Sequence, residues 1–403
     1  MESRKIYSST GNNSDNLNQD ALGQNKNNLL ISSVLIICLY LIPNLLFLWK
    51  YFDQYLTPIW IPAIIYTIVS IIIVFAPTKT TCLKLPAKYQ TVLFFVAVGL
   101  LALAFTFLVK RFNPVNIGNG RYPALFAFIN DVAQGIFPYS TKNFVSGFPF
   151  LFVLALPFYF LGDLGLWQIF SFIVFAVIVY LYGYHHYRDK LKVMVLLSIS
   201  PMFLYEIVAR SELFSNMVSV ILYYLLFKAI FRRQNIFIII LLGVVGGFLL
   251  STRGIVLLAY IIFMGYLYRQ GRFNYIALII ALGVGFAITI IPFMLWNLPQ
   301  FIELGPFAIQ MLYIPKWFLF LLVLLAAYFA FKVKSEKQMN FAIAITMFVA
   351  VLYPFLVAVL NFGLAATLFS DKFDISYFNF AQPFFLLALN WPVKEKALYE
   401  PAG

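Results

Sequence analysis

The sequence has 403 residues, of which 63% are hydrophobic and only 11% carry charged side chains, with a formal net charge of +13. Soluble domains carry roughly 25% charged and roughly 45–50% apolar residues, so this composition excludes an ordinary soluble protein. Cytoplasmic loops of membrane proteins collect Lys and Arg, which explains the positive charge without a nucleic-acid partner. We therefore expect an all-α, multi-pass protein of the plasma (inner) membrane that contacts lipids and no nucleic acid.

The chain divides into two polar ends and a long apolar middle. Residues 1–28 are rich in Ser, Asn and Gln and lack an apolar run, which predicts a disordered cytoplasmic tail. Residues 29–396 are predicted to form a single transmembrane domain, followed by a cytoplasmic tail at 397–403. The apolar runs fall at 29–49, 58–77, 90–109, 148–162, 164–183, 192–209, 213–231, 236–251, 254–268, 274–296, 317–332, 339–361 and 375–391.

Basic residues in alternate loops predict the orientation of these runs. All basic loops lie on the cytoplasmic side only if the run at 148–162 does not cross the membrane. That run is short, contains Pro149 and Pro157, and ends at Gly162 and Asp163. We interpret it as a re-entrant or broken helix that enters from outside, which is tolerated where protein buries it. This interpretation gives about twelve spans with both termini in the cytoplasm. The alternative is that the run 148–162 is an ordinary short span.

The longest polar stretch, residues 110–147, follows the third apolar run. Loops of this length in a compact architecture are usually functional or disordered. This stretch contains too many aromatic and aliphatic residues to be disordered. In the predicted topology it is a large outer loop, so we expect the functional site on the outer face.

Ionisable residues at the ends of apolar runs tend to mark function in membranes. Glu206 and Arg210 are four residues apart and can pair on one helix face, with Glu212 close behind. An interfacial ion pair that reaches water is one interpretation; a site for a phosphate-bearing ligand is the other. Arg253 interrupts the hairpin 236–268, where it either caps the hairpin or holds an anionic head group by a forked contact.

Several short motifs follow one another in a characteristic order. In that order the chain resembles the GT-C glycosyltransferases, especially the bacterial mannosyltransferase-like branch related to the enzyme that adds mannose in glycolipid-anchor synthesis. The resemblance covers roughly residues 90 to 310. The matching pieces lie at 134–139, 146–152, 161–163, 200–216 and 292–307.

The resemblance implies an all-helical GT-C-like fold and a hexosyltransferase activity. A sugar, mannose in the related branch, would pass from a polyprenyl-phosphate donor to a lipid or glycan acceptor at the outer face. A carboxylate would act as general base on the acceptor hydroxyl. Arginines would stabilise the departing lipid phosphate. The candidates for this phosphate contact are Arg121, Arg210 and Arg253.

One departure from the family concerns the base. The family acid closely follows the first core span, whereas this chain has Gly118-Asn119-Gly120 there. Either Asp131 supplies the base from the loop, or Glu206, Glu212 or Asp163 supplies it from across the cavity. A protein that no longer catalyses is the third possibility. Asp131 can equally be a surface acid on an amphipathic helix of the loop.

The remaining candidates concern substrate binding and rival functions. Tyr122 and Tyr139 are candidates for stacking on a sugar or prenyl chain, and Asn297 is a further candidate for substrate binding. Adjacent histidines without a Cys/His cluster do not predict a metal site, and no cofactor is expected. A flippase or transporter of lipid-linked substrate is the main alternative, although the spans contain few charges, and a non-catalytic envelope protein is another.

Overall fold

The protein is described by a computed structural model that covers the following residues: 34–52, 58–76, 86–117, 121–140, 145–181, 187–230, 235–271, 274–311, 314–370 and 372–389. In these ranges every regular element is a helix and none is a strand, so the all-α prediction is confirmed. The predicted tails at 1–28 and 397–403 lie outside the described residues.

The helices follow one another along the chain with short connections. After the helix Val34–Phe52 come α2 Trp60–Phe75, α3 Ala87–Arg111, the 3₁₀ helix η1 Pro114–Ile117, α4 Tyr122–Ala133, α5 Pro149–Phe160, α6 Gly165–Leu181, α7 Tyr187–Ser198, α8 Pro201–Ala209 and α9 Leu213–Ile230. The second half contains α10 Ile236–Leu250, α11 Val256–Gln270, α12 Tyr275–Trp296, α13 Leu298–Leu304, α14 Pro306–Gln310, α15 Lys316–Lys332, α16 Glu336–Phe362, α17 Leu364–Phe369, η3 Ile375–Phe380 and α18 Gln382–Ala388.

Five described helices are long and apolar enough to cross a membrane by themselves. They are Val34–Phe52, α3, α9, α12 and α16. Two bent pairs, α5 with α6 and α7 with α8, raise the number to seven if each pair is one span, and α2, α10 and α11 are shorter apolar helices. This pattern is typical of a membrane-embedded protein, while the expected count of about twelve spans stays a prediction.

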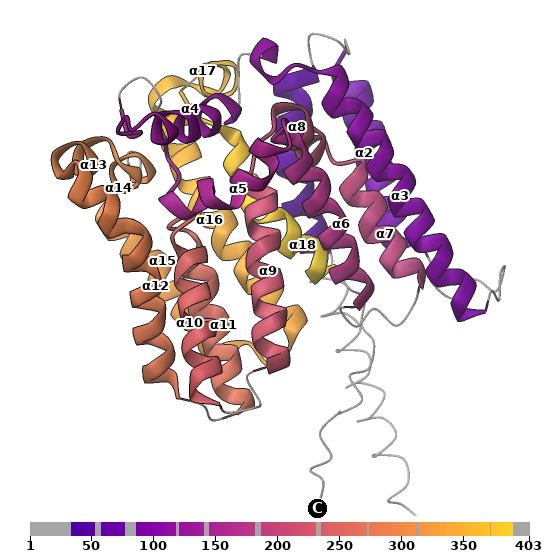
Figure 1. Cartoon of the computed structure of the whole chain (residues 1–403). Coiled ribbons are helices and arrows are strands. Elements are labelled where there is room, and N and C mark those ends of the chain that lie inside the picture. The colour runs from indigo at the N-terminus through magenta and orange to yellow at the C-terminus, as the bar shows by residue number, and fades with distance from the viewer. Residues whose placement is uncertain are drawn as a thin grey trace, which may run out of the picture.

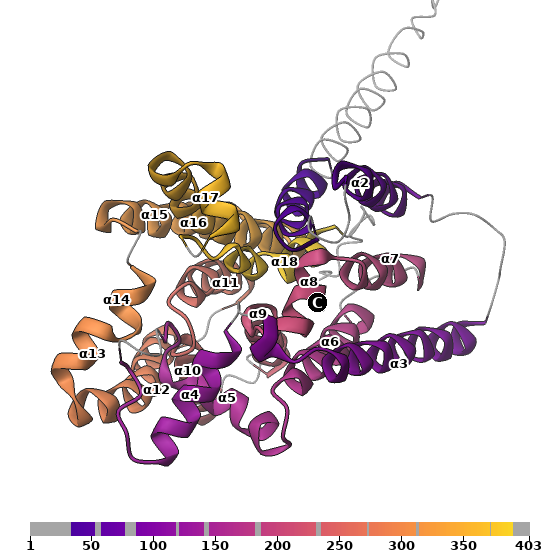
Figure 2. The same ribbon diagram turned by 90° about the horizontal axis from the view of Figure 1, so that it is seen from above.

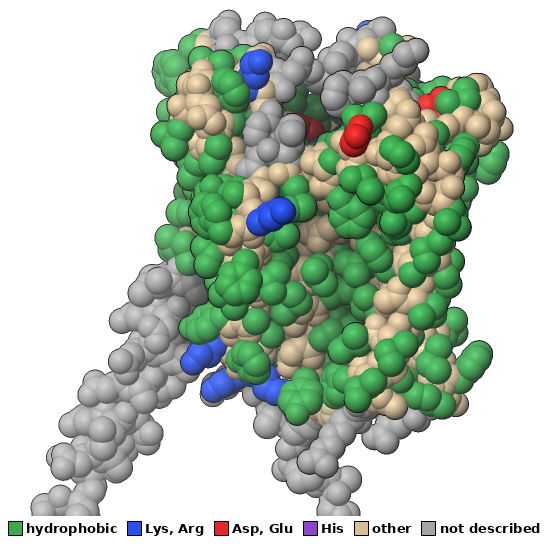
Figure 3. Space-filling view, turned by 90° about the vertical axis from the view of Figure 1, so that its left-hand side faces the viewer, with side chains coloured by type: hydrophobic (Ala, Val, Ile, Leu, Met, Phe, Trp, Pro, Cys, Tyr) green, Lys and Arg blue, Asp and Glu red, His purple; other side chains and the backbone are tan. Residues whose placement is uncertain are grey.

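The surface agrees with a membrane environment. In the space-filling view, hydrophobic side chains cover the middle of the face, several Lys and Arg side chains lie at its lower edge, and Asp and Glu lie near its upper edge (Figure 3). The large aliphatic side chains of α3 and α12 are prominent among the exposed residues, including Leu103 and Leu295. Exposure of this kind is expected where lipid rather than water surrounds a helix.

The segment predicted as broken or re-entrant is α5 together with the turn that follows it. At 12 residues, α5 is about 18 Å long, too short for a hydrocarbon core of roughly 30 Å. The chain bends by 104° between α5 and α6. Gly162 in this turn has a φ of +89°, a conformation that side chains other than glycine rarely adopt. A bend of this size fits a broken span or a re-entrant loop, so the path of this run through the membrane stays a prediction.

The described parts of the polar loop 110–147 fold over one end of the bundle, which we call the α4 end. Figure 1 shows α4, α13, α14 and α17 together at this end, and Figure 2 shows α9 and α11 between α4–α5 and α15–α17. The apolar face of α4 packs down through Leu125, Phe128 and Ile129, all buried. The rings of Phe128 and Phe152 stack with centroids 3.5 Å apart, which ties the loop helix to α5.

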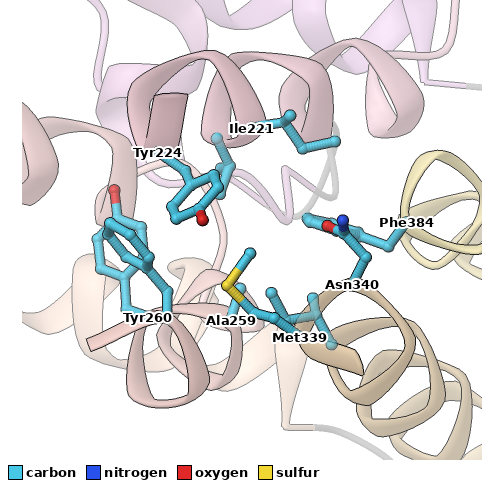
Figure 4. A pocket seen from close by; sticks show the side chains of 10 residues that line it. Ile221, Tyr224, Ala259, Tyr260, Met339, Asn340 and Phe384 are labelled. Atoms are coloured by element: carbon cyan, nitrogen blue, oxygen red, sulfur yellow. The ribbon is translucent and has the colours of Figure 1, made fainter. Parts of the chain in front are cut away.

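The centre of the bundle is tightly packed. A cavity of about 10 Å³ lies among Tyr224, Tyr260, Met339 and Asn340, where α9, α11 and α16 meet (Figure 4). A volume of about 10–15 Å³ is needed for one water, so this space accepts at most a single water molecule. A larger space lies at the α4 end of the bundle.

The α10–α12 contact depends on glycine and gives a stability prediction. A Cβ atom on Gly285 would lie 2.2 Å from the carbonyl oxygen of Val244, whereas a Cβ on Gly283 of the same helix meets nothing within 4 Å. Gly285→Ala should therefore destabilise the protein by about 1–3 kcal/mol through overpacking. Gly283→Ala is the matched control and should be neutral or slightly stabilising. Thermal unfolding in detergent, followed by size-exclusion chromatography, measures both; equal melting temperatures would contradict the packing described.

Candidate functional site

A cavity of about 280 Å³ opens at the α4 end. Its volume is close to the lower limit of small-molecule sites, which span roughly 300–1,000 Å³. Its polar side chains come from parts of the chain far apart in sequence. They are Arg121, Ser146, Glu212, Arg253, Asp374 and Tyr377. The apolar lining comprises Pro123, Ala124, Leu125, Val145, Leu151, Phe152 and Ile309, with Gly147 completing the wall.

Short turns and helix starts, rather than long helices, position these polar side chains. Arg121 occupies the residue directly before α4, where Pro123 in the first turn favours helix initiation. The chain before α5 is fixed to the α10–α11 turn by two backbone bonds, from Phe148 N to Thr252 O and from Phe150 N to Ser251 O, both 3.1 Å. These bonds place Ser146 beside Arg253, and the α10–α11 turn lies below α4 and α5 in Figure 1.

Two guanidinium groups meet at one hydroxyl oxygen. Ser146 Oγ accepts a 2.9 Å hydrogen bond from Arg121 Nη1 and a 2.7 Å bond from Arg253 Nη1. Arg253 is only 3% exposed, and Arg121 is 9% exposed. Two like charges brought together away from water are costly unless anions neutralise them. The site therefore needs negative partners.

Two carboxylates supply this compensation. Arg121 Nη2 pairs with Asp374 Oδ2 at 2.9 Å, and Arg253 Nη2 donates to Glu212 Oε1. Asp374 caps η3 by accepting a 2.9 Å bond from Ser376 N. The two pairs differ in exposure, because the Glu212 side chain is 0% exposed and that of Asp374 is 38% exposed. Glu212 is thus fully buried, whereas Asp374 is accessible to solvent.

Tyr377 lies beside the two arginines in the cavity. The Arg121 guanidinium carbon lies 4.2 Å from the centre of the Tyr377 ring, a cation–π contact. Burial alone would raise the pKa of Tyr377, but Arg121 and Arg253 outweigh it and hold the pKa below its ordinary value. Burial would likewise raise the pKa of Asp374, and Arg121 with the Ser376 hydrogen bond lowers it overall. Asp374 is therefore a carboxylate at neutral pH.

Several buried polar atoms around the cavity have no hydrogen-bond partner among the described residues. They include the Nε atoms of Arg121 and Arg253 and the Oε2 atoms of Glu206 and Glu212. Glu206 is completely buried, and its Oε1 accepts a 3.1 Å bond from Phe214 N at the start of α9. Buried polar groups are nearly always satisfied in folded proteins, so these atoms are available to bond water or a ligand in the cavity.

Arg210 lies outside the lining of the cavity. It follows the last residue of α8 with a φ of +49°, and all three of its nitrogen groups are hydrogen-bonded. The acceptors are the carbonyl oxygens of Val109, Phe112 and Val208, at 2.6, 2.7 and 2.9 Å, and the carboxylate of Asp163 at 3.3 Å. The expected Glu206–Arg210 pair does not form, because α8 ends at Ala209 and the left-handed turn directs Arg210 away. A phosphate contact by Arg210 stays a prediction.

The other predicted residues are also away from the cavity lining. Asp131 is half-buried on α4, and Tyr122 starts that helix with its ring 5.9 Å from Phe126. Tyr139 is fully buried and donates a 3.0 Å bond to Gly147 O. Asn297 caps α13 by accepting from Gln300 N at 3.2 Å. These contacts position the loop segments; roles in catalysis or substrate binding stay predictions.

The structure brings together Arg121, Glu212 and Arg253 and adds three residues that the sequence did not single out. Ser146 lies in a matching motif of the family, but its central position depends on the chain path before α5. Asp374 and Tyr377 come from the C-terminal region, with Asp374 separated by 253 residues from its partner Arg121. An Asp two residues before Ser376 is a helix-start signal, yet no sequence pattern connects it with Arg121.

Comparisons with known proteins do not identify the chain: no protein-family model, curated protein or solved structure matches it. Within the described ranges, no group of three or more His, Cys, Asp and Glu side chains could hold a metal ion. His185 and His186 lie outside those ranges. The cavity is therefore interpreted from its own chemistry, which is a basic centre with accessible and buried carboxylates and an apolar wall.

The electrostatics predict an unusual titration of Tyr377. Ordinary tyrosines ionise near a pKa of about 10. Because Arg121 and Arg253 stabilise the phenolate, Tyr377 should ionise at lower pH than this. The phenolate absorbance of wild type minus that of Tyr377→Phe, followed against pH, isolates this group from the other tyrosines. In Arg121→Gln the same difference should move to higher pH, because one of the two cations that stabilise the phenolate is gone; an unchanged curve would contradict the described contact.

Proposed function

We propose that the protein is a membrane glycosyltransferase that takes a hexose from a polyprenyl-phosphate donor and transfers it to a lipid or glycan acceptor. The single observation that carries this proposal is the meeting of two buried guanidiniums at Ser146 Oγ in a cavity at the α4 end. The proposal places this end at the outer face of the plasma membrane and both termini in the cytoplasm.

The two arginines suit a phosphate. Arginine presents planar N–H groups that match phosphate oxygens in a forked arrangement, and burial strengthens such contacts. Arg121 and Arg253 approach one oxygen from two directions, and each has an unpartnered Nε. A donor phosphate near Ser146 would meet both groups. As the bond between sugar and phosphate breaks, the same groups stabilise the charge that develops on the leaving lipid phosphate.

The apolar lining suits the lipid part of the donor. Leu125, Leu151, Phe152 and Ile309 form this lining beside the charged centre. On the outside of α4, Phe126 and Val132 are exposed, as expected for an amphipathic helix in the membrane interface. A prenyl chain could therefore leave the cavity toward lipid while its phosphate stays at the arginines.

Asp374 is the best-placed general base. It lines the cavity, its side chain is 38% exposed, and its lowered pKa keeps it ionised. In the proposed reaction the acceptor hydroxyl attacks the anomeric carbon, the bond from that carbon to the phosphate oxygen breaks, and the hydroxyl proton passes to Asp374. Glu212 is held by Arg253, so it positions the arginine in the ligand-free protein.

Transfer of radiolabelled sugar tests this assignment. Purified protein in lipid should transfer sugar from one member of a panel of polyprenyl-phosphate donors. Asp374→Asn should reduce turnover by about a hundred-fold to ten-thousand-fold, the usual contribution of a general base, while donor binding is kept. Arg253→Gln should lose donor binding, and Asp131→Asn is the comparison for the base predicted from the sequence. Loss of turnover in Asp131→Asn alone would move the base to the loop helix.

A second function, a flippase or transporter of a lipid-linked substrate, is favoured by one feature. The α7–α8 pair bends by 58° at a break next to Ser200. Ser200 Oγ donates a hydrogen bond to Asn44 Oδ1 and accepts one from Gln382 Nε2, both at 2.6 Å. Broken helices with buried polar groups are typical of transporters. Movement of a fluorescent prenyl phosphate between the leaflets of proteoliposomes, without sugar transfer, would support this function over the enzyme. A non-catalytic protein would show neither activity.

The proposed orientation has its own test. Single cysteines introduced at Asp131 on α4 and at Lys334, an exposed residue between α15 and α16, should react from opposite sides of intact cells. A membrane-impermeant maleimide should label the α4 position from outside and the Lys334 position only after permeabilisation, because the turn between α15 and α16 is a predicted cytoplasmic loop. Replacement of Cys38 and Cys82 by serine provides the background. The reverse pattern would place the cavity at the cytoplasmic face and exclude an outer-face donor.

A further inference from the structure

The side chain of Gln310, the last residue of α14, joins two of the turns that form the cavity. Its Nε2 donates a 2.6 Å hydrogen bond to the carbonyl oxygen of Ser146, and its Oε1 accepts a 2.9 Å bond from Gly254 N. Ser146 lies before α5, and Gly254 follows Arg253 in the α10–α11 turn. One amide group therefore holds, through their backbones, the two segments whose side chains meet at Ser146 Oγ.

The two partners fix the orientation of this amide group. A backbone carbonyl only accepts hydrogen bonds and a backbone N–H only donates them, so Nε2 must face Ser146 and Oε1 must face Gly254. A carboxylate of the same length would place an oxygen against the carbonyl oxygen of Ser146. An apolar side chain would bond neither group. Glutamine meets both requirements with one side chain.

Both bonds act at the residues that form the arginine pair. One orients Ser146, whose Oγ accepts from Arg121 and Arg253, and the other holds the peptide group between Arg253 and Gly254. The 2.7 Å contact between Arg253 Nη1 and Ser146 Oγ spans the two segments, so a shift of one segment against the other changes it. The backbone bonds from the start of α5 to the α10–α11 turn involve neither Ser146 nor Gly254.

The α13–α14 segment lies between the cavity and the apolar surface. Ile309, next to Gln310, lines the cavity, whereas Ile302 and Phe307 of the same segment are exposed. The ring of Phe307 also contacts that of Phe148 edge to face, with centroids 4.8 Å apart. Exposed apolar side chains of this kind are expected where lipid surrounds a segment. A segment with an exposed apolar side therefore holds the polar centre of the cavity.

We propose that Gln310 is a positioning residue for phosphate binding, which holds Ser146 and Arg253 in the relative position that an anionic phosphodiester requires. The inference rests on the proposed function, in that Arg121 and Arg253 hold the donor phosphate. Gln310 does not belong to the lining of the cavity, so it acts through the residues that it holds. Loss of its amide group should therefore weaken phosphate binding although no ligand contact is removed.

The first test measures the affinity of the full-length protein in lipid for a short-chain prenyl methyl phosphodiester by calorimetric titration. Gln310→Met keeps the length of the side chain and removes both hydrogen bonds. It should weaken binding by about tenfold or more, because small displacements of positioned groups lose much of their effect. Gln310→Glu should bind no better than Gln310→Met, since its carboxylate repels the Ser146 carbonyl oxygen. Gln300→Met, at an exposed position of α13, is the matched control and should bind as wild type does.

A second test examines the arginine pair without a ligand. Arg253 and Arg121 together hold the pKa of Tyr377 below its ordinary value, so the phenolate absorbance of Tyr377 reports on the position of Arg253. The absorbance of each protein minus that of the same protein with Tyr377→Phe isolates this group. In Gln310→Met the phenolate should form at higher pH than in wild type, and in Gln300→Met at the same pH. A loss of stability alone would lower the melting temperature without moving this curve.

The outcomes separate the inference from the proposed function. Equal probe affinity in wild type and Gln310→Met, or an unchanged Tyr377 curve in Gln310→Met, overturns the inference and leaves the proposed function standing. The absence of probe binding by the wild type overturns the proposed function and, with it, the role of Gln310 in phosphate binding. Weaker binding together with a shifted curve, in Gln310→Met but not in Gln300→Met, supports both.

Discussion

The structure of the α4 end depends on one costly interaction, the approach of Arg121 and Arg253 to a common hydroxyl oxygen on Ser146. Two buried cations that share an acceptor repel each other, so the surrounding chain must supply anions at fixed positions. Glu212 and Asp374 do so from the start of α9 and from the segment before η3. The two guanidiniums and the two carboxylates therefore form one charge-compensated cluster around Ser146.

The long helices form the bundle, and the turns and short helices between them carry the polar side chains of the cavity. The polar residues of the cavity lie before α4, before α5, before α9, in the α10–α11 turn and around η3, all places where the backbone changes direction. Backbone bonds from the start of α5 to Ser251 and Thr252 join two of these segments. Irregular backbone inside a membrane protein is tolerated only where other protein satisfies it, so these contacts serve both the fold and the site.

Composition and hydropathy predicted the all-helical class, because a chain surrounded by lipid must satisfy its backbone hydrogen bonds internally and α-helices do so. Of the predicted site residues, Arg121, Glu212 and Arg253 meet in the cavity. A charged side chain in apolar surroundings is costly unless an opposite charge pairs with it, and these residues pair there. The expected Glu206–Arg210 pair was wrong because its spacing assumed a continuous helix, whereas α8 ends at Ala209. Asp374 and Tyr377 were beyond reach, because no local pattern indicates a contact across 253 residues.

An experimental structure of the protein in lipid with a non-hydrolysable polyprenyl phosphonate tests the central claim most directly. The account predicts that the phosphonate lies beside Ser146, within hydrogen-bond distance of the guanidiniums of Arg121 and Arg253, with its prenyl chain against Leu151 and Phe152. A phosphonate bound at Arg210, or at the opposite end of the bundle, with the Arg121–Ser146–Arg253 contacts unchanged, would contradict it.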